Sequence, residues 1–132
     1  MKINGMKLVQ LAREAAKNAY APYSCYRVGA VILAPDGKMF CGCNVENVAF
    51  SASICAERAA VAQAVSAGYT EFVAIAIAGS GMEMAYPCRI CRQVLAEFLR
   101  KDTKIFCANS VGKYEVFTLE ELLPYRFYTG LK

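Results

Sequence analysis

The amino-acid sequence predicts an α/β fold in which a mixed five-stranded sheet lies between layers of helices. Compact apolar runs of strand length alternate with longer segments whose apolar residues recur at helical spacing. Two of the helical segments connect one strand to the next, and such a crossover makes that part of the sheet parallel. Two other pairs of strands are joined by turns too short for a crossover, so these pairs are expected to be antiparallel hairpins.

The first elements are a helix and a hairpin. Apolar residues recur at helical spacing over 6–20, which predicts a helix. The valine-rich run over 27–34 predicts a strand, and a Pro-Asp-Gly-Lys turn over 35–38 reverses the chain. The returning strand is expected over 38–44, followed by a loop over 44–54.

The middle of the chain is expected to contain two helices separated by a buried strand. A helix over 56–67 is ended by Gly68, because glycine readily adopts the left-handed conformation that follows a helix. The apolar run over 71–78 predicts the strand. Pro87 begins the next helix, which is expected to continue to about Arg100.

The last elements are predicted to be a hairpin and a short helix. The strands are expected over 104–108 and 114–118, and the five residues between them are too few for a crossover helix. Thr118 and Glu121 have the spacing of a capping box, which predicts that a short helix follows the second strand.

Length and composition indicate one cytoplasmic domain. The 132 residues are enough for a single domain, spanning 1–132. The net charge of +4 is scattered, which argues against a nucleic-acid partner. The first ten residues lack the apolar core of a signal peptide, and no apolar stretch reaches the ~20 residues that span a membrane. A hydrophobic content of 57% suggests that other subunits cover part of the surface.

The chain contains no histidine and seven cysteines. The absence of histidine excludes a Ser-His-Asp triad, a Cys-His pair and any imidazole metal ligand. In a reducing compartment the cysteines are expected to be thiols, and their odd number argues against a complete disulfide framework. A metal in this protein would therefore be held by Cys, Asp or Glu.

Three cysteines have the pattern of a catalytic zinc site. Cys55 lies at the start of one predicted helix, and Cys88 and Cys91 lie in the first turn of the next. Both helices follow strands, so their N-termini are expected at one edge of the sheet, where their partial positive charge favours thiolates. Three protein ligands leave the fourth tetrahedral position for water, and we expect one Zn²⁺ per chain.

Charged residues beside these cysteines have the chemistry that such a site needs. Glu57 is expected to lie near the water and to act as the general acid and base. Arg58 and Arg89 could donate hydrogen bonds to the sulfurs and so offset the net negative charge of three thiolates on Zn²⁺. The alternatives are a structural zinc site or three buried thiols, although a structural site normally has a fourth ligand. Small core residues are the interpretation of the other cysteines, Cys25, Cys41, Cys43 and Cys107.

Over residues 21–127 the sequence resembles the small homotetrameric cytidine deaminases. The metal-site pattern that Cys55, Glu57, Cys88 and Cys91 match is shared by all zinc deaminases. The Asn-Val-Glu-Asn segment over 44–47 is typical of the members that act on nucleosides. The segments that carry the resemblance are Ala21-Pro22-Tyr23-Ser24, Val28-Gly29-Ala30, Asn44-Val45-Glu46-Asn47, Cys55-Ala56-Glu57-Arg58, Cys88, Cys91-Arg92-Gln93-Val94-Leu95 and Leu122-Leu123-Pro124.

The resemblance implies a three-layer α/β/α cytidine-deaminase-like fold and a zinc-dependent reaction. Cytidine and 2′-deoxycytidine would be hydrolysed to uridine and 2′-deoxyuridine with release of ammonia, as in pyrimidine salvage. Glu57 would move a proton from water to the ring N3 and then to the departing amine. The resemblance also implies a homotetramer in which neighbouring subunits complete each site.

The same resemblance assigns five substrate contacts. Asn44 and Glu46 would bind the ribose 3′-hydroxyl, and their amide and carboxylate groups suit a hydroxyl that both donates and accepts. Tyr26 would pack against the base, and Ala56 would contribute backbone groups to it. Phe127 would reach into a neighbouring subunit's site and stack on the pyrimidine.

Four positions depart from the family pattern. Phe50, Tyr86, Tyr26 and Arg89 stand where the family commonly has Tyr, Ser, Phe and Gly. These departures leave open the preference among cytidine, deoxycytidine and a modified nucleoside. The competing functions are a blasticidin-type deaminase of antibiotic nucleosides, a polynucleotide editor, a non-catalytic zinc or nucleoside-binding module, and a redox thiol protein. Lack of histidine and the short 109–113 connection argue against the editor, and Glu57 argues against the binding module.

Overall fold

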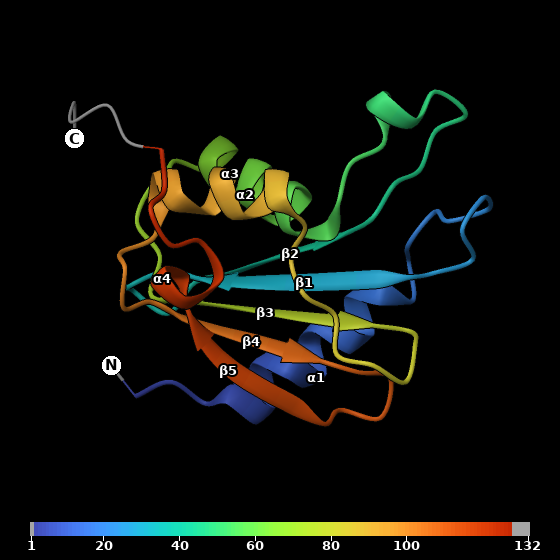
Figure 1. Ribbon diagram of the computed structural model, residues 1–132. Coiled ribbons are helices and arrows are strands. Elements are labelled where there is room, and N and C mark those ends of the chain that lie inside the picture. Colours follow the sequence, from blue (N-terminus) through green and yellow to red (C-terminus); the bar gives the residue numbers. More distant parts are fainter. Residues whose placement is uncertain (1, 128–132) are drawn as a thin grey trace.

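The computed structural model describes residues 2–127 and contains a mixed five-stranded sheet with helices on both faces (Figure 1). Helix α1 covers one face, and helices α2 and α3 cover the other. The expected three-layer α/β/α architecture is therefore confirmed. In chain order the elements are α1 (Gly5–Ala16), β1 (Val28–Leu33), β2 (Met39–Cys43), a 3₁₀ helix (Phe50–Ala52), α2 (Ala56–Ser66), β3 (Ala74–Gly79), α3 (Arg89–Phe98), β4 (Lys104–Ala108), β5 (Tyr114–Thr118) and α4 (Leu119–Leu122).

The strand order is β2-β1-β3-β4-β5. Strands β3 and β4 pair in parallel, as the crossover through α3 requires, and β4 and β5 form the expected antiparallel hairpin. Strand β3 pairs with β1 and not with β2, so the pairing at this side of the sheet is antiparallel. The burial of the strands agrees with this order, because β1 is almost wholly buried and the edge strand β2 is mostly not.

Strand β3 lies at the centre of two hydrophobic cores. Ile75 and Ile77 pack in the core under α2 and α3, whereas Ala74 and Ala76 pack in the core under α1. All six residues of the strand are buried. Burial on both faces explains why this strand is a continuous apolar run in the sequence and shows no alternation.

Helix α1 ends at Ala16, four residues before the predicted end at Tyr20. The guanidinium of Arg27 donates to the Lys17 carbonyl at 2.9 Å, and the Tyr20 amide donates to the Asn44 carbonyl at 3.0 Å. These bonds lead the chain out of the helix toward the loop after β2. Ala19 is nevertheless buried, which explains why the apolar spacing extends beyond the helix.

The predicted bounds of two other elements are also shifted. Strand β3 begins at Ala74 and not at residue 71, although Phe72 before it is buried. Helix α3 begins at Arg89, two residues after Pro87, and Cys88 is its N-cap. Cys55 is likewise the N-cap of α2, so two of the three candidate ligands occupy the same position on their helices.

The prediction that four cysteines are core residues is correct for Cys107 and wrong for Cys25 and Cys41, which are exposed, while Cys43 is half-buried. Cys41 and Cys43 lie on the edge strand β2, which pairs with only one other strand, β1. Cys25 is in a loop and has a positive φ of 58°.

Large apolar side chains are exposed at several places on this single chain. Val48 and Phe50 lie in the segment between β2 and α2, which extends away from the sheet in Figure 1, and Phe50 is 80% exposed. Ile90 in α3 and Phe127 near the end of the described chain are also exposed. Within residues 2–127, none of the helices has the length and apolar character needed to cross a bilayer.

Candidate metal centre and active site

The sulfur atoms of Cys55, Cys88 and Cys91 lie within 4.8 Å of one another. The Sγ atom of Cys88 is 3.8 Å from that of Cys55 and 3.4 Å from that of Cys91. Two thiolates bound about 2.3 Å from a tetrahedral Zn²⁺ are about 3.8 Å apart, so the three side chains already have the spacing of zinc ligands. Within residues 2–127 no other three Cys, Asp or Glu side chains form such a group.

The position of each cysteine follows from the fold. Helix α2 follows β2, and α3 follows β3, and these two strands run in the same direction on either side of β1. The N-termini of both helices therefore meet at one edge of the sheet. Free backbone N–H groups at these ends favour negatively charged sulfur; the Cys91 amide, for example, donates to Cys88 Sγ at 3.5 Å.

Arg58 is the cation that contacts the cysteines. Its Nη2 atom lies 3.6 Å from Cys55 Sγ and 3.5 Å from the Ser53 carbonyl. Its Nε atom is buried and has no hydrogen-bond partner among the described residues. Arg89 is exposed, and none of the hydrogen bonds found in residues 2–127 joins it to a sulfur. The structure thus places Arg58, and not Arg89, beside a ligand.

The thiols of this cluster differ in acidity. Hydrogen bonds from Cys91 and Arg58 lower the pKa of Cys55 to about 5, against the opposing effect of burial. The pKa of Cys91 is raised, first by its hydrogen bond to Cys55 and then by burial. A divalent cation between the three sulfurs would stabilise them as thiolates, which is a role that Zn²⁺ fits.

Glu57 lies in the first turn of α2 with 4% of its surface exposed. Burial raises the pKa of its carboxyl to about 7, and the charge of Cys55 acts in the same direction. A carboxyl with such a pKa both accepts and releases a proton near neutral pH. Burial, and then the charge of Glu57, raise the pKa of the core thiol Cys107 to about 12.

Tyr26 packs against Gly79 at the end of β3. Its pKa is raised by burial and then by the charges of Glu57 and Glu83, and 38% of its surface is exposed. Its hydroxyl occupies the space where residue 79 would have a Cβ, and Gly79 leaves that space free. Ala56, between Cys55 and Glu57, is completely buried.

Asn44 and Glu46 organise the loops around Tyr26. The Asn44 amide group accepts from the Val28 amide at 2.8 Å and donates to the Tyr26 carbonyl at 2.9 Å. Glu46 Oε1 accepts from the amides of Tyr23 and Ser24 at 3.0 and 3.1 Å, and Glu46 Oε2 accepts from the Ser24 hydroxyl. These donors lower the pKa of the Glu46 carboxyl.

Phe127 is placed against the outer side of α3. The Gln93 side-chain amide donates to the Phe127 carbonyl at 3.4 Å, and the phenyl group is 75% exposed. It shares a surface hollow with residues from the C-terminal half of α3. The ligands Cys88 and Cys91 are at the opposite end of that helix. Phe127 of this chain is therefore free to contact another molecule.

The structure adds three residues that sequence reasoning did not assign to the site. Ser24 binds Glu46, and Gly79 accommodates Tyr26. Arg92 donates to the Pro87 carbonyl at 2.7 Å and to the Leu122 carbonyl at 2.8 Å, and so fixes the chain before Cys88 against α4. Ser24 and Arg92 both lie in segments that carry the family resemblance, whereas the contact of Gly79 with Tyr26 joins distant segments and had no signal in the sequence.

Comparisons with known proteins agree with this geometry. The family model described as "Cytidine and deoxycytidylate deaminase zinc-binding region" matches residues 3–108. The cytidine deaminase of Sporosarcina psychrophila is 42% identical over 92% of this chain and 89% of its own length. That of Halalkalibacterium halodurans is 41% identical, with 91% of each chain covered.

Solved structures show the same relationship. The crystal structure of the Burkholderia pseudomallei cytidine deaminase superimposes with a TM-score of 0.90 at 39% identity, covering 95% of this chain and all of the other. The Mycobacterium tuberculosis cytidine deaminase superimposes with a TM-score of 0.82 at 34% identity, covering 97% of this chain and all of the other.

Proposed function

This chain belongs to the cytidine and deoxycytidylate deaminase family, and from this we propose that its site hydrolyses cytidine to uridine and ammonia. The activity is that of a zinc-dependent cytidine deaminase. We extend the proposal to 2′-deoxycytidine and to a role in pyrimidine salvage. The main support for this proposal is the group formed by the sulfurs of Cys55, Cys88 and Cys91. The buried Glu57 follows Cys55 by two residues in the chain.

The three sulfurs would hold the zinc ion, and Arg58 would offset part of their charge. Zinc, when bound, lowers the pKa of water and so makes it a nucleophile at neutral pH. Three protein ligands suit a catalytic rather than a structural site, because a structural zinc usually has four.

Glu57 is proposed to move the protons of the reaction. In the ionised form its carboxylate accepts a proton from the attacking water. It then protonates ring N3 while the water oxygen bonds to C4. It next carries the remaining proton of that oxygen to the 4-amino nitrogen, so that the C4 carbonyl forms as the C4–N4 bond breaks and ammonia leaves. A pKa raised by burial to about 7 allows both protonation states during one cycle.

The substrate contacts remain proposals supported by position. The charge of Glu57 contributes to the raised pKa of Tyr26, which supports contact between this ring and the base. Asn44 and Glu46 lie in the adjacent loop and would bind the ribose in addition to their backbone partners. Ala56 would offer backbone groups to the base.

We propose that the protein is a homotetramer in which a neighbouring subunit completes each site. Phe127 and Phe50 are 75% and 80% exposed in the single chain, and burying these apolar side chains against a neighbouring subunit would be favourable. In this arrangement Phe127 of one subunit would stack on the pyrimidine held by another. Analytical ultracentrifugation of the zinc-loaded protein tests the assembly.

The reaction is tested with zinc-loaded protein and cytidine, by following the ultraviolet absorbance change and the ammonia released. We expect stoichiometric uridine and ammonia. Turnover should be lost after a chelator removes zinc, and it should return when zinc is added back.

Zinc-loaded, folded protein that does not deaminate cytidine or 2′-deoxycytidine would contradict the proposal. A panel of modified cytosine nucleosides would then test the alternative substrate class that Arg89, Tyr86 and Phe50 leave open. Binding of a nucleoside without any turnover would instead indicate a non-catalytic module.

A further inference from the structure

A second pocket lies on the α1 face of the sheet, opposite the face that carries the cysteines. It has a volume of about 400 Å³ and lies where the end of α1 meets the end of β3 and the β4–β5 turn. We call it the α1 pocket. Its polar lining comes from Gln10, Arg13, Lys17, Arg27, Ser80 and Ser110.

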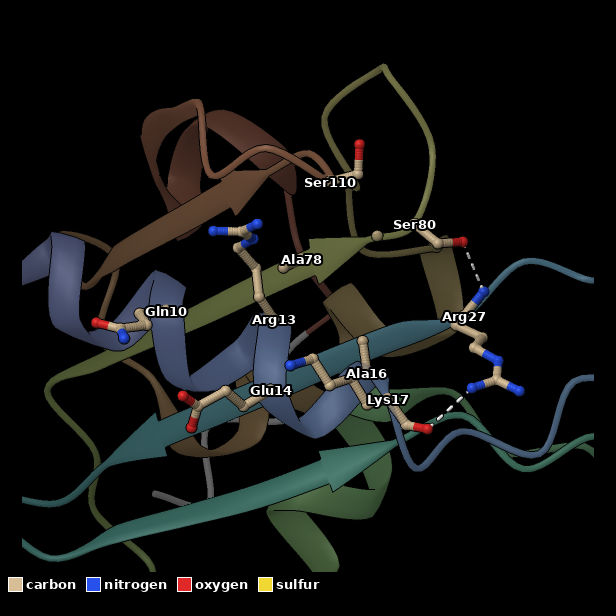
Figure 2. Close-up of a pocket in the computed structure, with 10 residues that line it drawn as sticks. Gln10, Arg13, Glu14, Ala16, Lys17, Arg27, Ala78, Ser80 and Ser110 are labelled. Carbon is tan, nitrogen blue, oxygen red and sulfur yellow. Dashed lines mark hydrogen bonds between the residues drawn. The ribbon is translucent and has the colours of Figure 1, made fainter.

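Positive charge dominates the α1 pocket. Arg13, Lys17 and Arg27 line it, against the single carboxylate of Glu14. Figure 2 shows Arg13 and Glu14 pointing to different sides of α1. With three cations against one carboxylate, the lining keeps a net positive charge.

Two of the cations have free donors. Arg27 is used structurally, because its Nη1 atom donates to the Lys17 carbonyl at 2.9 Å. The side chains of Arg13 and Lys17 have no hydrogen-bond or ion-pair partner within residues 2–127. The C-terminal end of a helix stabilises cations through its dipole, but this leaves their N–H groups available to a ligand.

Hydroxyl groups complete the lining. Ser80 Oγ accepts from the Arg27 amide at 3.0 Å, which leaves its own proton free to donate. The Ser110 amide donates to the Gly81 carbonyl at 3.0 Å and so fixes this part of the β4–β5 turn. Figure 2 shows Ser80 and Ser110 near the end of strand β3, with Arg13 and Lys17 extending from α1.

The direction of Arg13 is set by its surroundings. A Cβ at Gly112 would lie 3.2 Å from Arg13 Nη1, so the guanidinium lies against the β4–β5 turn. The parallel N–H groups of a guanidinium match two phosphate oxygens.

We propose that the α1 pocket binds a phosphate monoester of a small metabolite. The phosphate would accept hydrogen bonds from Arg13, Lys17 and the two serine hydroxyls. A volume of about 400 Å³ is within the range of small-molecule pockets and much larger than a phosphate ion, so the remaining space would hold the organic part.

The test is isothermal titration of the zinc-loaded protein with ribose 5-phosphate and, separately, with inorganic phosphate at fixed salt. A matched control is available, because Arg100 and Lys101 form another exposed Arg–Lys pair outside this pocket. We expect R13Q/K17Q to weaken binding of ribose 5-phosphate by about tenfold or more, since charge-assisted hydrogen bonds are lost. R100Q/K101Q should leave it unchanged.

Amide chemical shifts give a second readout. We expect ribose 5-phosphate to shift the amides of Lys17, Ser80 and Ser110. Equal weakening by both double variants would show non-specific attraction and overturn the proposal, as would the absence of saturable binding. Inorganic phosphate that binds as tightly as ribose 5-phosphate would overturn the assignment to a monoester. Shifts confined to residues around Cys55 would place the ligand in the cysteine site and likewise overturn it.

Discussion

Gly42 of strand β2 lies against the Ala56 carbonyl of helix α2, and a Cβ at residue 42 would be 2.6 Å from that oxygen. The backbone amide of Ala60 is also within this space. The first turn of α2, which carries Cys55 and Glu57, therefore rests directly on the backbone of β2.

Gly42→Ala is expected to lower the free energy of unfolding by about 1–3 kcal/mol, because the backbone atoms it meets must shift. Urea denaturation checks this, and zinc content reports whether Cys55 has moved. Gly81→Ala is the control, since its Cβ would meet only Tyr26 at an ordinary 3.4 Å. An equally large loss at residue 81 would mean that the close approach at Gly42 is not the cause.

Glu57→Gln is expected to reduce kcat for cytidine by a factor on the order of 10²–10⁴. The amide has nearly the shape of the carboxyl but does not carry a proton between water and the base. Zinc content should remain one per chain. Glu120→Gln, at an exposed position of α4, should keep full activity. A fully active Glu57 variant would show that another group moves the proton.

Arg58→Gln is expected to weaken zinc binding by about tenfold, because groups that hydrogen-bond to metal ligands typically contribute this much. Arg58 contacts Cys55 Sγ at 3.6 Å, whereas Arg89 is exposed. Arg89→Gln should therefore change the affinity much less. Competition with a chromophoric chelator measures the zinc affinity of both variants. A larger loss of affinity in the Arg89 variant would show that Arg89, and not Arg58, supports the zinc ligands.

Glu46→Gln is expected to be less stable than the wild type, by an amount that depends on pH. Hydrogen bonds from Ser24 and Tyr23 lower the pKa of the Glu46 carboxyl in the folded protein. Their stabilisation is complete above the ordinary carboxyl pKa of about 4.3 and is lost as the pH falls through the lowered value.

Denaturant unfolding from pH 7 to pH 3 measures this difference. Zinc release at low pH affects the wild type and the variant alike, so the gap between them is the quantity to follow. Glu120→Gln should show a gap that is small at every pH. A gap at Glu46 that widens toward pH 3 would contradict the assigned direction of the pKa shift.

Local patterns in the sequence determined most elements and the metal ligands. The capping box of Thr118 and Glu121 is present, and β4 and β5 have the predicted bounds. The triad of Cys55, Cys88 and Cys91 could be predicted because each ligand lies at a helix start that the sequence marks. These features depend on interactions between residues close together in the chain, so the order of residue types in the sequence is enough to predict them.

Only the tertiary structure decided the relations between distant segments. Strand β3 pairs with β1 and not with β2. Helix α1 ends just before Lys17, whose carbonyl accepts a hydrogen bond from the Arg27 guanidinium. The exposure of Cys41 follows from the edge position of β2. The pKa of Glu57 and the gathering of Arg13, Lys17 and Ser110 likewise depend on burial and on long-range contacts. Such contacts join residues far apart in the chain, so spacing within the sequence does not reveal them.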